Sequence, residues 1–555
     1  MRPQKRVVVT ASAQSRRDFL KTGISGTALA AALPHLGVVE HMATSLRASA
    51  VMDFELDEAT IADLGEAMHT GKETARTIAE KYLVRIQTVD KDGPSLNSVI
   101  ELNPEALSIA DQLDEERKAK GARGPMHGIP VLIKDNIDTA DRMATTAGSL
   151  ALIGSKPPGD SFLVQQLRSA GAVILGKTNL SEWANIRSSH STSGWSGRGG
   201  LTKNPYALDR NTSGSSSGSG AAVSANLCAV AVGTETDGSI VSPSSINGLV
   251  GIKPTVGLVS RTGVIPISHT QDTPGPMART VRDAAILLGA LTGIDSTDTA
   301  TMAGKGKVPA DYTKFLDPAG LKGARLGIVR SFFGFHEGVD VVMKDALAAL
   351  KDQGAVLIDP VEIKSFAQLG NAEELVLHYE LKADMNAYLG RLGPDAPVHS
   401  LKDIIEFNEK NKQREMPYFG QDTFIKADAK GPLTSKEYVA ALDKCRKLTR
   451  KDGIDAALAK HRLDALVAPT DSPAWLTDLV DGDHFLGGSS TPAAVAGYPS
   501  ITVPAGLVFG LPVGISFFAS AWNEPKLIKL AYAFEQATRS RKIPRFLPTV
   551  DVSIS

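Results

Sequence analysis

The sequence contains a series of short, nearly all-apolar runs rich in β-branched residues. They read IPVLIK, AVILG, RLGIVR, AVLI, DALVAP, SITVP and VGISFF, at residues 129–134, 172–176, 325–330, 355–358, 464–469, 500–504 and 513–518. Strands this apolar are usually covered on both faces, and several of the runs are separated by helical patterns such as residues 337–354. The sequence therefore predicts a single large α/β domain with a central mixed sheet covered by helices.

Helix signals also precede the first of these runs. Residues 58–90 place Ile61, Leu64 and Met68 at helical spacing. Asn103 and Pro104 are residue types preferred at a helix cap and in a first turn, so together they predict the start of a helix.

The charge balance argues against a protein that binds nucleic acid or a membrane surface. Lysine and arginine number 60 and aspartate and glutamate 61, so no strong imbalance attracts polyanions. Aromatic residues make up only 5% of the chain, which leaves few platforms for stacked bases. We therefore expect a small-molecule or short-peptide ligand and no nucleic-acid partner.

The two cysteines, Cys228 and Cys445, lack the ligand spacing of a metal site, so no metal is predicted. Cys228 lies in AAVSANLCAVAVG, residues 221–233, a run typical of a buried helix that leads into a strand. This context predicts a small core residue rather than a reactive thiol. The sequence leaves open a disulfide between the two cysteines.

The first 50 residues have the parts of an export signal in order. SRRDFLK at residues 15–21 is followed by a mildly apolar segment at 22–39 and by ASA at 48–50. The pair Arg16–Arg17 predicts a twin-arginine signal at 1–50, recognised by the twin-arginine export machinery, and a mature domain at 51–555. The alternative is an amphipathic surface helix. No later run reaches about eighteen apolar residues, so we expect a soluble periplasmic or secreted protein without a membrane partner after cleavage.

A phosphate-loop pattern, GxxxxGK[ST], occurs at residues 171–178 as GAVILGKT. In a phosphate loop, flexible backbone N–H groups after a strand turn toward the phosphates. Here the four middle residues are themselves the predicted strand. A nucleotide site is therefore not expected.

Three polar segments carry the candidate chemistry: GIPVLIKDNID at 128–138, SGSSSGSG at 213–220 and GTETDGSI at 233–240. A serine nucleophile needs a base, yet none of the three contains histidine and the chain has no GxSxG elbow. Lys134, at the end of an apolar run, acts as a base only if burial lowers its pKa, and Asp135 and Asp138 must then point elsewhere. Considered alone, the position of Lys134 is typical of a surface lysine and that of Ser239 is typical of a helix cap.

The serine–glycine segment itself has two readings, a flexible linker or a structured loop. A buried helical pattern follows it at once, which is not the setting of a tether. We therefore expect a structured loop.

The serine–glycine segment at 213–220 and the segment at 233–240 are followed by NGLVGIKPTVGLVSRTGVIP at 247–266. Together they resemble the signature region of the amidase signature family, and GIPVLIKDNIDT resembles its lysine segment. Ser215 and Ser239 are 24 residues apart, as are the family's bridging serine and nucleophile. The resemblance implies an amide hydrolase without cofactor on an α/β/α fold. It implies Ser239 as nucleophile, Ser215 after a cis peptide bond as proton bridge and Lys134 as base. The resemblance further implies that backbone N–H groups of Thr236, Asp237, Gly238 and Ser239 form the oxyanion hole. We expect the neighbouring serines Ser216, Ser217 and Ser219 to hydrogen-bond the loop in place.

Within the family, the segments GKTNLSEWAN, SGWSGRGG and GTETDGSIVSP most resemble bacterial peptide amidases, which remove ammonia from C-terminal peptide amides. Asp237 and Glu235 depart from the commonest family pattern, which has glycine and aspartate there. The first two of these segments are expected to line the substrate pocket, although Trp183 and Trp195 read equally well as packing residues. Three alternatives stay open: one component of an amidotransferase complex, a broad-specificity amidase, and a binding protein that has lost the activity.

Overall fold

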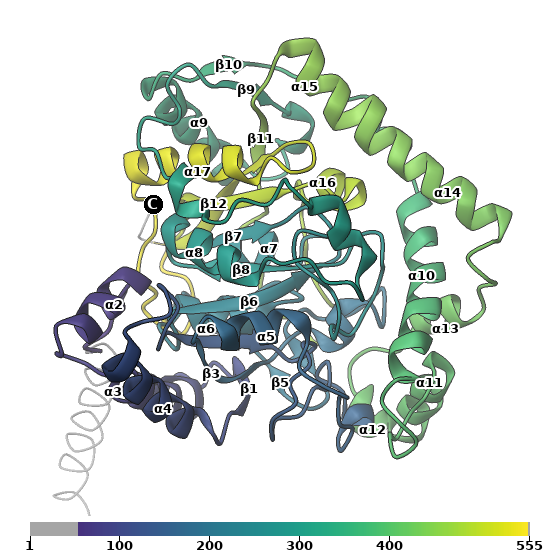
Figure 1. Cartoon of the computed structure of the whole chain (residues 1–555). Helices are drawn as coiled ribbons and strands as arrows, with labels where there is room; N and C mark the ends of the chain where they lie inside the picture. Colours follow the sequence, from purple (N-terminus) through teal and green to yellow (C-terminus); the bar gives the residue numbers. More distant parts are fainter. Residues whose placement is uncertain (1–53, 553–555) are drawn as a thin grey trace, which may run out of the picture. The chain divides into compact units, whose positions relative to one another are not determined.

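An eleven-stranded mixed sheet forms the centre of the protein, whose structure, a computed structural model, describes residues 54–552 (Figure 1). The predicted leader at 1–50 lies outside the described residues. In spatial order the strands are β1 (Val99–Leu102), β3 (Val173–Thr178), β2 (Pro130–Lys134), β6 (Val230–Glu235), β8 (Thr273–Ala278), β7 (Val250–Lys253), β12 (Ser500–Val508), β13 (Leu511–Phe518), β11 (Ala465–Pro469), β9 (Arg325–Ile328) and β10 (Val356–Ile358). All seven apolar runs are strands of this sheet, so the predicted α/β fold is confirmed.

The parallel pairing of β2 with β3 and with β6 brings three strand ends together. Their carboxyl ends are Lys134, Thr178 and Glu235, and all three residues are buried. In open α/β sheets, ligands bind outside the carboxyl ends of the strands. This edge is therefore where the fold gathers polar side chains that are far apart in the sequence.

Strand β8 was not among the predicted strands, because its sequence TPGPMA has two prolines, which are disfavoured in a central strand. The sheet accommodates these prolines because β8 pairs unequally with its two neighbouring strands. It pairs with β6 along its whole length but with β7 only at Met277 and Ala278. Pro274 and Pro276 thus take part in the hydrogen-bond ladder with β6 only.

Helices surround the sheet. The main ones are α2 (Ile61–His69), α3 (Ala75–Arg85), α4 (Ala106–Lys120), α5 (Phe162–Ser169), α6 (Ser217–Ser224), α7 (Val241–Ile246), α8 (Val281–Leu291), α9 (Glu337–Asp352), α16 (Thr491–Ala496) and α17 (Glu524–Thr538). Helices α6 and α7 pack on β6 and β7, and α9 and α17 pack on β12. None of the helices in residues 54–552 is long and apolar enough to cross a bilayer.

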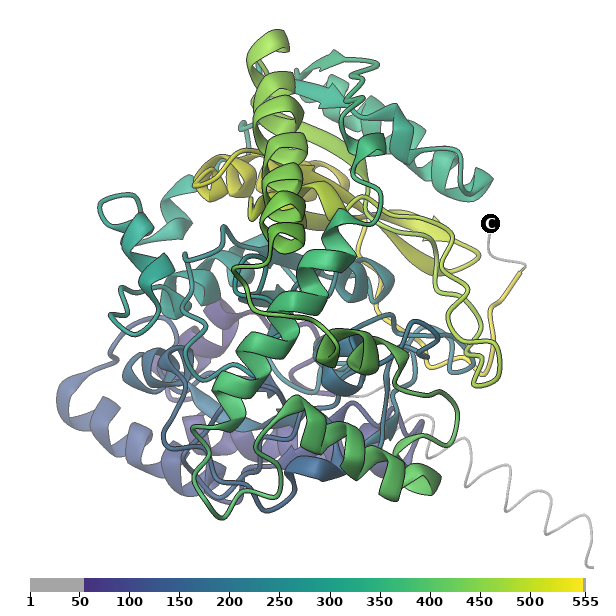
Figure 2. The same ribbon diagram turned by 90° about the vertical axis from the view of Figure 1, so that its right-hand side faces the viewer.

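A helical segment between β10 and β11 lies on one side of this assembly. It contains α10 (Ala372–Leu389), α11 (Leu401–Lys410), α12 (Lys412–Glu415), α13 (Asp422–Asp428), α14 (Lys436–Arg446) and α15 (Asp455–His461). Helix α10 packs against α13 and α14, and Figure 2 shows these green helices crossing the face turned to the viewer. Trp183, from the core region, is buried among the apolar side chains of this segment and meets Phe424 edge to face.

The helix predicted after Asn103 begins later than the sequence indicates. Asn103 Oδ1 accepts a hydrogen bond from Glu105 N at 2.9 Å, so its side chain closes a turn. Regular α-helix then starts at Ala106.

Candidate active site

Lys134, Ser215 and Thr234 meet at the carboxyl ends of β2 and β6. The Lys134 side chain is fully buried, and its Nζ lies 2.8 Å from Ser215 Oγ and 3.1 Å from Ser216 Oγ. Nζ also lies 3.0 Å from Thr234 Oγ1 and 3.2 Å from the Thr234 carbonyl oxygen. Lys134 is therefore not a surface lysine but the centre of a buried hydroxyl cluster.

Burial lowers the pKa of Lys134 to about 7, against the opposing influence of Asp272 and Glu235. An ammonium group loses its hydration on burial, which disfavours the charged form. At neutral pH a large share of the lysine is then a free amine, the form able to accept a proton.

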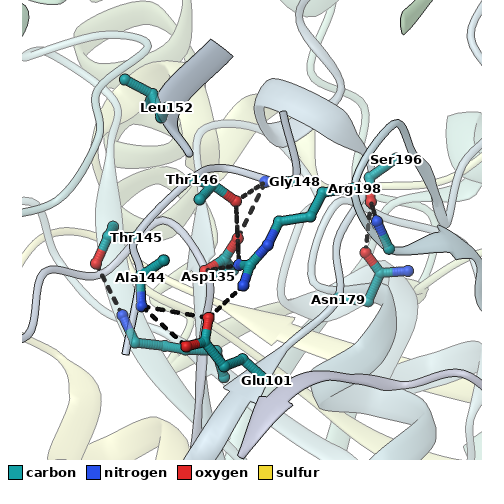
Figure 3. Close-up of polar contacts among 12 residues, drawn as sticks. Glu101, Asp135, Ala144, Thr145, Thr146, Gly148, Leu152, Asn179, Ser196 and Arg198 are labelled. Atoms are coloured by element: carbon teal, nitrogen blue, oxygen red, sulfur yellow. Dashed lines mark hydrogen bonds and ion pairs between the residues drawn. The ribbon is translucent and has the colours of Figure 1, made fainter. Parts of the chain in front are cut away.

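The two aspartates that follow Lys134 point away from it, as expected. Asp135 accepts hydrogen bonds from Thr146 Oγ1 and from Gly148 N and forms an ion pair with Arg198, which also pairs with Glu101 (Figure 3). Asp138 accepts a hydrogen bond from Tyr388 OH at 2.8 Å. The two carboxylates thus bind side chains and backbone of neighbouring segments and form no ion pair with the Lys134 amine.

The serine–glycine segment is a tightly packed part of the site. The Gly214–Ser215 peptide bond is cis, as the family resemblance implied, and α6 begins two residues later at Ser217. A Cβ on Gly214 would lie 2.1 Å from Ser181 Oγ, and one on Gly218 would lie 2.3 Å from the Ser98 carbonyl oxygen. A side chain at Gly218 would collide with backbone, and one at Gly214 would displace the Ser181 hydroxyl, so the segment is closely packed and is not a tether.

The serines around Ser215 hold this loop, as predicted. Ser216 Oγ donates to the Thr234 carbonyl at 3.1 Å, and Ser217 Oγ donates to the Ser213 carbonyl at 2.7 Å. Ser219 Oγ lies 2.8 Å from Thr178 Oγ1 at the end of β3. These bonds connect the loop to two strand ends of the sheet.

Ser239 lies in the turn between β6 and α7. Its carbonyl oxygen accepts a hydrogen bond from Ser216 N at 3.2 Å, which joins the two serine-bearing loops. The residue is 8% exposed, and within residues 54–552 its Oγ forms no hydrogen bond, including none to Ser215. The hydroxyl thus has no partner in the described chain and is partly accessible. Ser239 is not the helix cap, because that position is taken by Ile240.

The turn at 236–239 presents free backbone donors. The N–H groups of Asp237, Gly238 and Ser239 donate to no other residue of the described chain. Gly238 has a φ of +81°, and a Cβ there would lie 3.1 Å from Ser490 Oγ. Glycine therefore permits the left-handed turn that leaves these donors unpaired.

Glu235 and Asp237, the two departures from the common family pattern, both hold this turn. Glu235 Oε2 accepts hydrogen bonds from Ile240 N at 2.8 Å and Val241 N at 3.0 Å, at the start of α7. Asp237 Oδ2 accepts a hydrogen bond from Thr491 Oγ1 at 2.6 Å, at the start of α16.

Other residues of the site were not predicted. Besides Thr234, they include Asp272, which accepts a hydrogen bond from Thr236 Oγ1 at 2.6 Å and whose pKa burial raises to about 6. Ser242 Oγ lies 2.6 Å from Ser213 Oγ and donates to Asp471. The only sequence signal for Thr234 is a hydroxyl at the end of an apolar strand. Asp471 has no such signal, because it follows a strand that is far from the three polar segments in the sequence.

The remaining candidates have structural roles. Lys177 of the rejected phosphate loop is buried in β3 and donates to the Ile137 carbonyl at 2.6 Å. Trp183 and Trp195 are both buried, and Trp195 packs edge to face on Tyr418 and Phe419, so packing accounts for both. Cys228 and Cys445 are free and buried.

One group among residues 54–552, His269, Glu380 and Asp384, has ligand atoms close enough to hold a metal. These side chains already satisfy one another: His269 Nδ1 lies 2.8 Å from Asp384 Oδ2, and its Nε2 lies 3.4 Å from Glu380 Oε1. The arrangement is explained by hydrogen bonding and ion pairing alone.

Comparison with known proteins identifies the chain as an amide-hydrolysing enzyme. The Amidase family matches residues 77–528, so the chain belongs to that family. It is 44% identical over 503 residues to a "probable amidase" of Arabidopsis thaliana, covering 89% of this chain and 93% of the relative. It is 33% identical over 496 residues to one component of the Glutamyl-tRNA(Gln) amidotransferase of Halorhodospira halophila, covering 87% of this chain and 98% of the relative.

Among solved structures, the native peptide amidase from Stenotrophomonas maltophilia is 50% identical, with a TM-score of 0.85. The match covers 89% of this chain and all of that one. The protein is therefore an amidase-family enzyme, similar in structure to a peptide amidase.

Proposed function

We propose that this enzyme hydrolyses the carboxamide of C-terminally amidated peptides or amino-acid amides, releasing ammonia and a carboxylic acid. The observation that carries the proposal is the contact of the buried Lys134 amine, its pKa lowered to about 7, with Ser215 Oγ, one loop away from the accessible hydroxyl of Ser239. The likeness to a peptide amidase over the whole of that chain supports peptide amides as the substrate class.

In the proposed first step, the Lys134 amine takes the proton of Ser215 Oγ while Ser215 takes the proton of Ser239 Oγ. Ser239 Oγ then attacks the carboxamide carbon and gives a tetrahedral intermediate. The relay requires the Ser215 and Ser239 hydroxyls to come into contact once substrate is bound, and catalytic hydrogen bonds commonly tighten in that complex.

The intermediate collapses when its C–N bond breaks and the proton returns from Lys134 through Ser215 to the leaving nitrogen. Ammonia departs, and the acyl group stays on Ser239 as an ester. Water, deprotonated by the same relay, attacks this ester; the bond to Ser239 Oγ then breaks, the proton returns from Lys134 through Ser215 to Ser239 Oγ, and the acid is released. The free N–H groups of residues 237–239 are the proposed donors to the oxyanion in both steps, which contributes several kcal/mol to lowering the barrier.

The test of the substrate class is a panel of peptide amides, free amino-acid amides, aryl amides and fatty amides, with ammonia release measured for each. We expect the highest kcat/KM with a peptide amide or amino-acid amide, without any added tRNA or ATP. A preference for aryl or fatty amides would replace the peptide-amide proposal with a broad-specificity amidase. A requirement for tRNA and ATP would instead indicate a component of an amidotransferase, like the relative from Halorhodospira halophila.

We further propose that the protein is exported through its paired arginines, Arg16 and Arg17. Expressed in a bacterium with a twin-arginine system, the wild type should accumulate in the periplasm or medium in a shortened form. Replacing both arginines with lysine should keep it in the cytoplasm at full length. Equal export of the two forms would contradict this proposal.

A further inference from the structure

Asp237 has one carboxylate oxygen that lacks a donor. Its Oδ2 receives the Thr491 hydroxyl at 2.6 Å, whereas its Oδ1 is buried and receives no hydrogen bond from any residue of the described chain. A buried acceptor without a donor costs about 1–3 kcal/mol, so such an atom needs an explanation. Here the atom belongs to the turn that carries the proposed oxyanion donors.

The carboxyl group of Glu373, in the first turn of α10, interacts with the Asp237 carboxylate. Glu373 Oε1 accepts a hydrogen bond from Gln271 Nε2 at 2.9 Å. Gln271 Nε2 also lies 3.3 Å from the Thr236 carbonyl oxygen, at the start of the same turn. Glu373 is therefore connected to the turn through both Asp237 and Gln271.

Two ionised carboxylates in contact would repel each other, whereas a proton on one of them turns the contact into a hydrogen bond. Burial and the charge of Asp237 raise the pKa of Glu373 well above its usual range. The proton thus resides on Glu373, whose O–H is the donor that Asp237 Oδ1 lacks.

We propose that Glu373, as a neutral acid, donates a hydrogen bond to Asp237 and so holds the turn 236–239 in the geometry that aims its N–H groups at the reacting carbonyl. It is a positioning residue, because it acts through Asp237 and not on substrate. The inference rests on the proposed function, for which this turn is the oxyanion hole.

The other charges around the pair favour this assignment. Glu235 and Lys253, from β6 and β7, interact electrostatically with Asp237, and Lys253 is the cation of these two. From α14, the titratable group that faces Glu373 is Cys445, whose own pKa is raised to about 12 by burial. No residue of 54–552 forms an ion pair with Glu373, so the hydrogen bond from Gln271 alone favours its charged form, against burial and the charge of Asp237.

The consequence is an alkaline limit to activity. When Glu373 loses its proton, Asp237 and Glu373 become two facing anions and the turn is pushed apart. We expect kcat to fall at high pH while KM changes less, because the turn acts on the transition state.

The test compares Glu373→Gln with Glu373→Ala on a neutral peptide amide from pH 6 to 10. Glutamine can donate its amide N–H to Asp237 and accept from Gln271, so E373Q should keep kcat within about threefold of wild type and lose the alkaline fall. E373A should lower kcat by about tenfold or more, because the turn then loses one buried hydrogen bond. Glu374→Gln, at an exposed neighbouring position on α10, is the control and should match wild type throughout.

An E373Q variant with the wild-type alkaline limb, or one as inactive as E373A, would overturn the proposal. So would wild-type kcat in E373A. Should E373A fail to fold, the pH profile of E373Q decides alone. Failure of the proposed function is distinguishable, because the wild type would then release no ammonia from any peptide amide.

Discussion

Replacing Ser239 with alanine is expected to lower kcat/KM for a peptide amide by about a thousandfold or more, with the melting temperature nearly unchanged. The reason is that the Ser239 hydroxyl would form the covalent bond to the acyl group, while within residues 54–552 it forms no hydrogen bond that supports the fold. Loss of the nucleophile therefore removes the chemistry and little packing. The measurement is steady-state ammonia release together with thermal unfolding of the same preparation.

The control for this variant is Ser108→Ala, which removes an exposed serine hydroxyl on α4. It should retain wild-type activity. An S239A enzyme with a kcat/KM within tenfold of wild type would show that another residue attacks the carbonyl.

Replacing Lys134 with methionine is expected to lower kcat/KM by a similar factor, because methionine fills the buried space without a group that accepts a proton. The wild-type pH profile should carry the signature of the same amine. The pKa is lowered from 10.5 to about 7, so the amine is protonated and inactive below pH 7 and free above it. We therefore expect kcat/KM to rise through about pH 7 and then to level off until the alkaline limit set by Glu373.

The matched control is Lys118→Met, at an exposed lysine of α4, which should leave rate and profile unchanged. A wild-type profile that is flat between pH 5 and 8, or an active K134M enzyme, would rule out Lys134 as the base.

Much of the fold could be predicted from the sequence, because the strands are buried on both faces and therefore appear as continuous apolar runs. Residues 129–134 and 513–518 are examples that need no tertiary information. Strand β8 was not predicted, because prolines such as Pro274 and Pro276 are rare in central strands. The limited pairing of β8 with β7 is what makes them acceptable here. Which strands are neighbours was also hidden, because register and order depend on long-range packing.

The candidate site divides in the same way. Lys134 and Ser215 are predictable as a pair from residue type and family resemblance, and the structure places them 2.8 Å apart. Glu373 could not be found, because it is an acidic residue at a helix start, more than 130 residues from the turn it contacts. Its role follows only from the unpaired oxygen of Asp237, an atom-level feature that no sequence pattern records.

If an uncharged Lys134 activates Ser239, the reactivity of the Ser239 hydroxyl must depend on pH. This is measured as the rate of covalent labelling of Ser239 by a sulfonyl fluoride at a series of pH values. The modified residue is identified by mass spectrometry. We expect labelling at Ser239 with a rate that rises sigmoidally about pH 7 in the wild type and is abolished in Lys134→Met. Labelling at another residue, or a rate at Ser239 that is independent of pH and unchanged in Lys134→Met, would contradict this expectation.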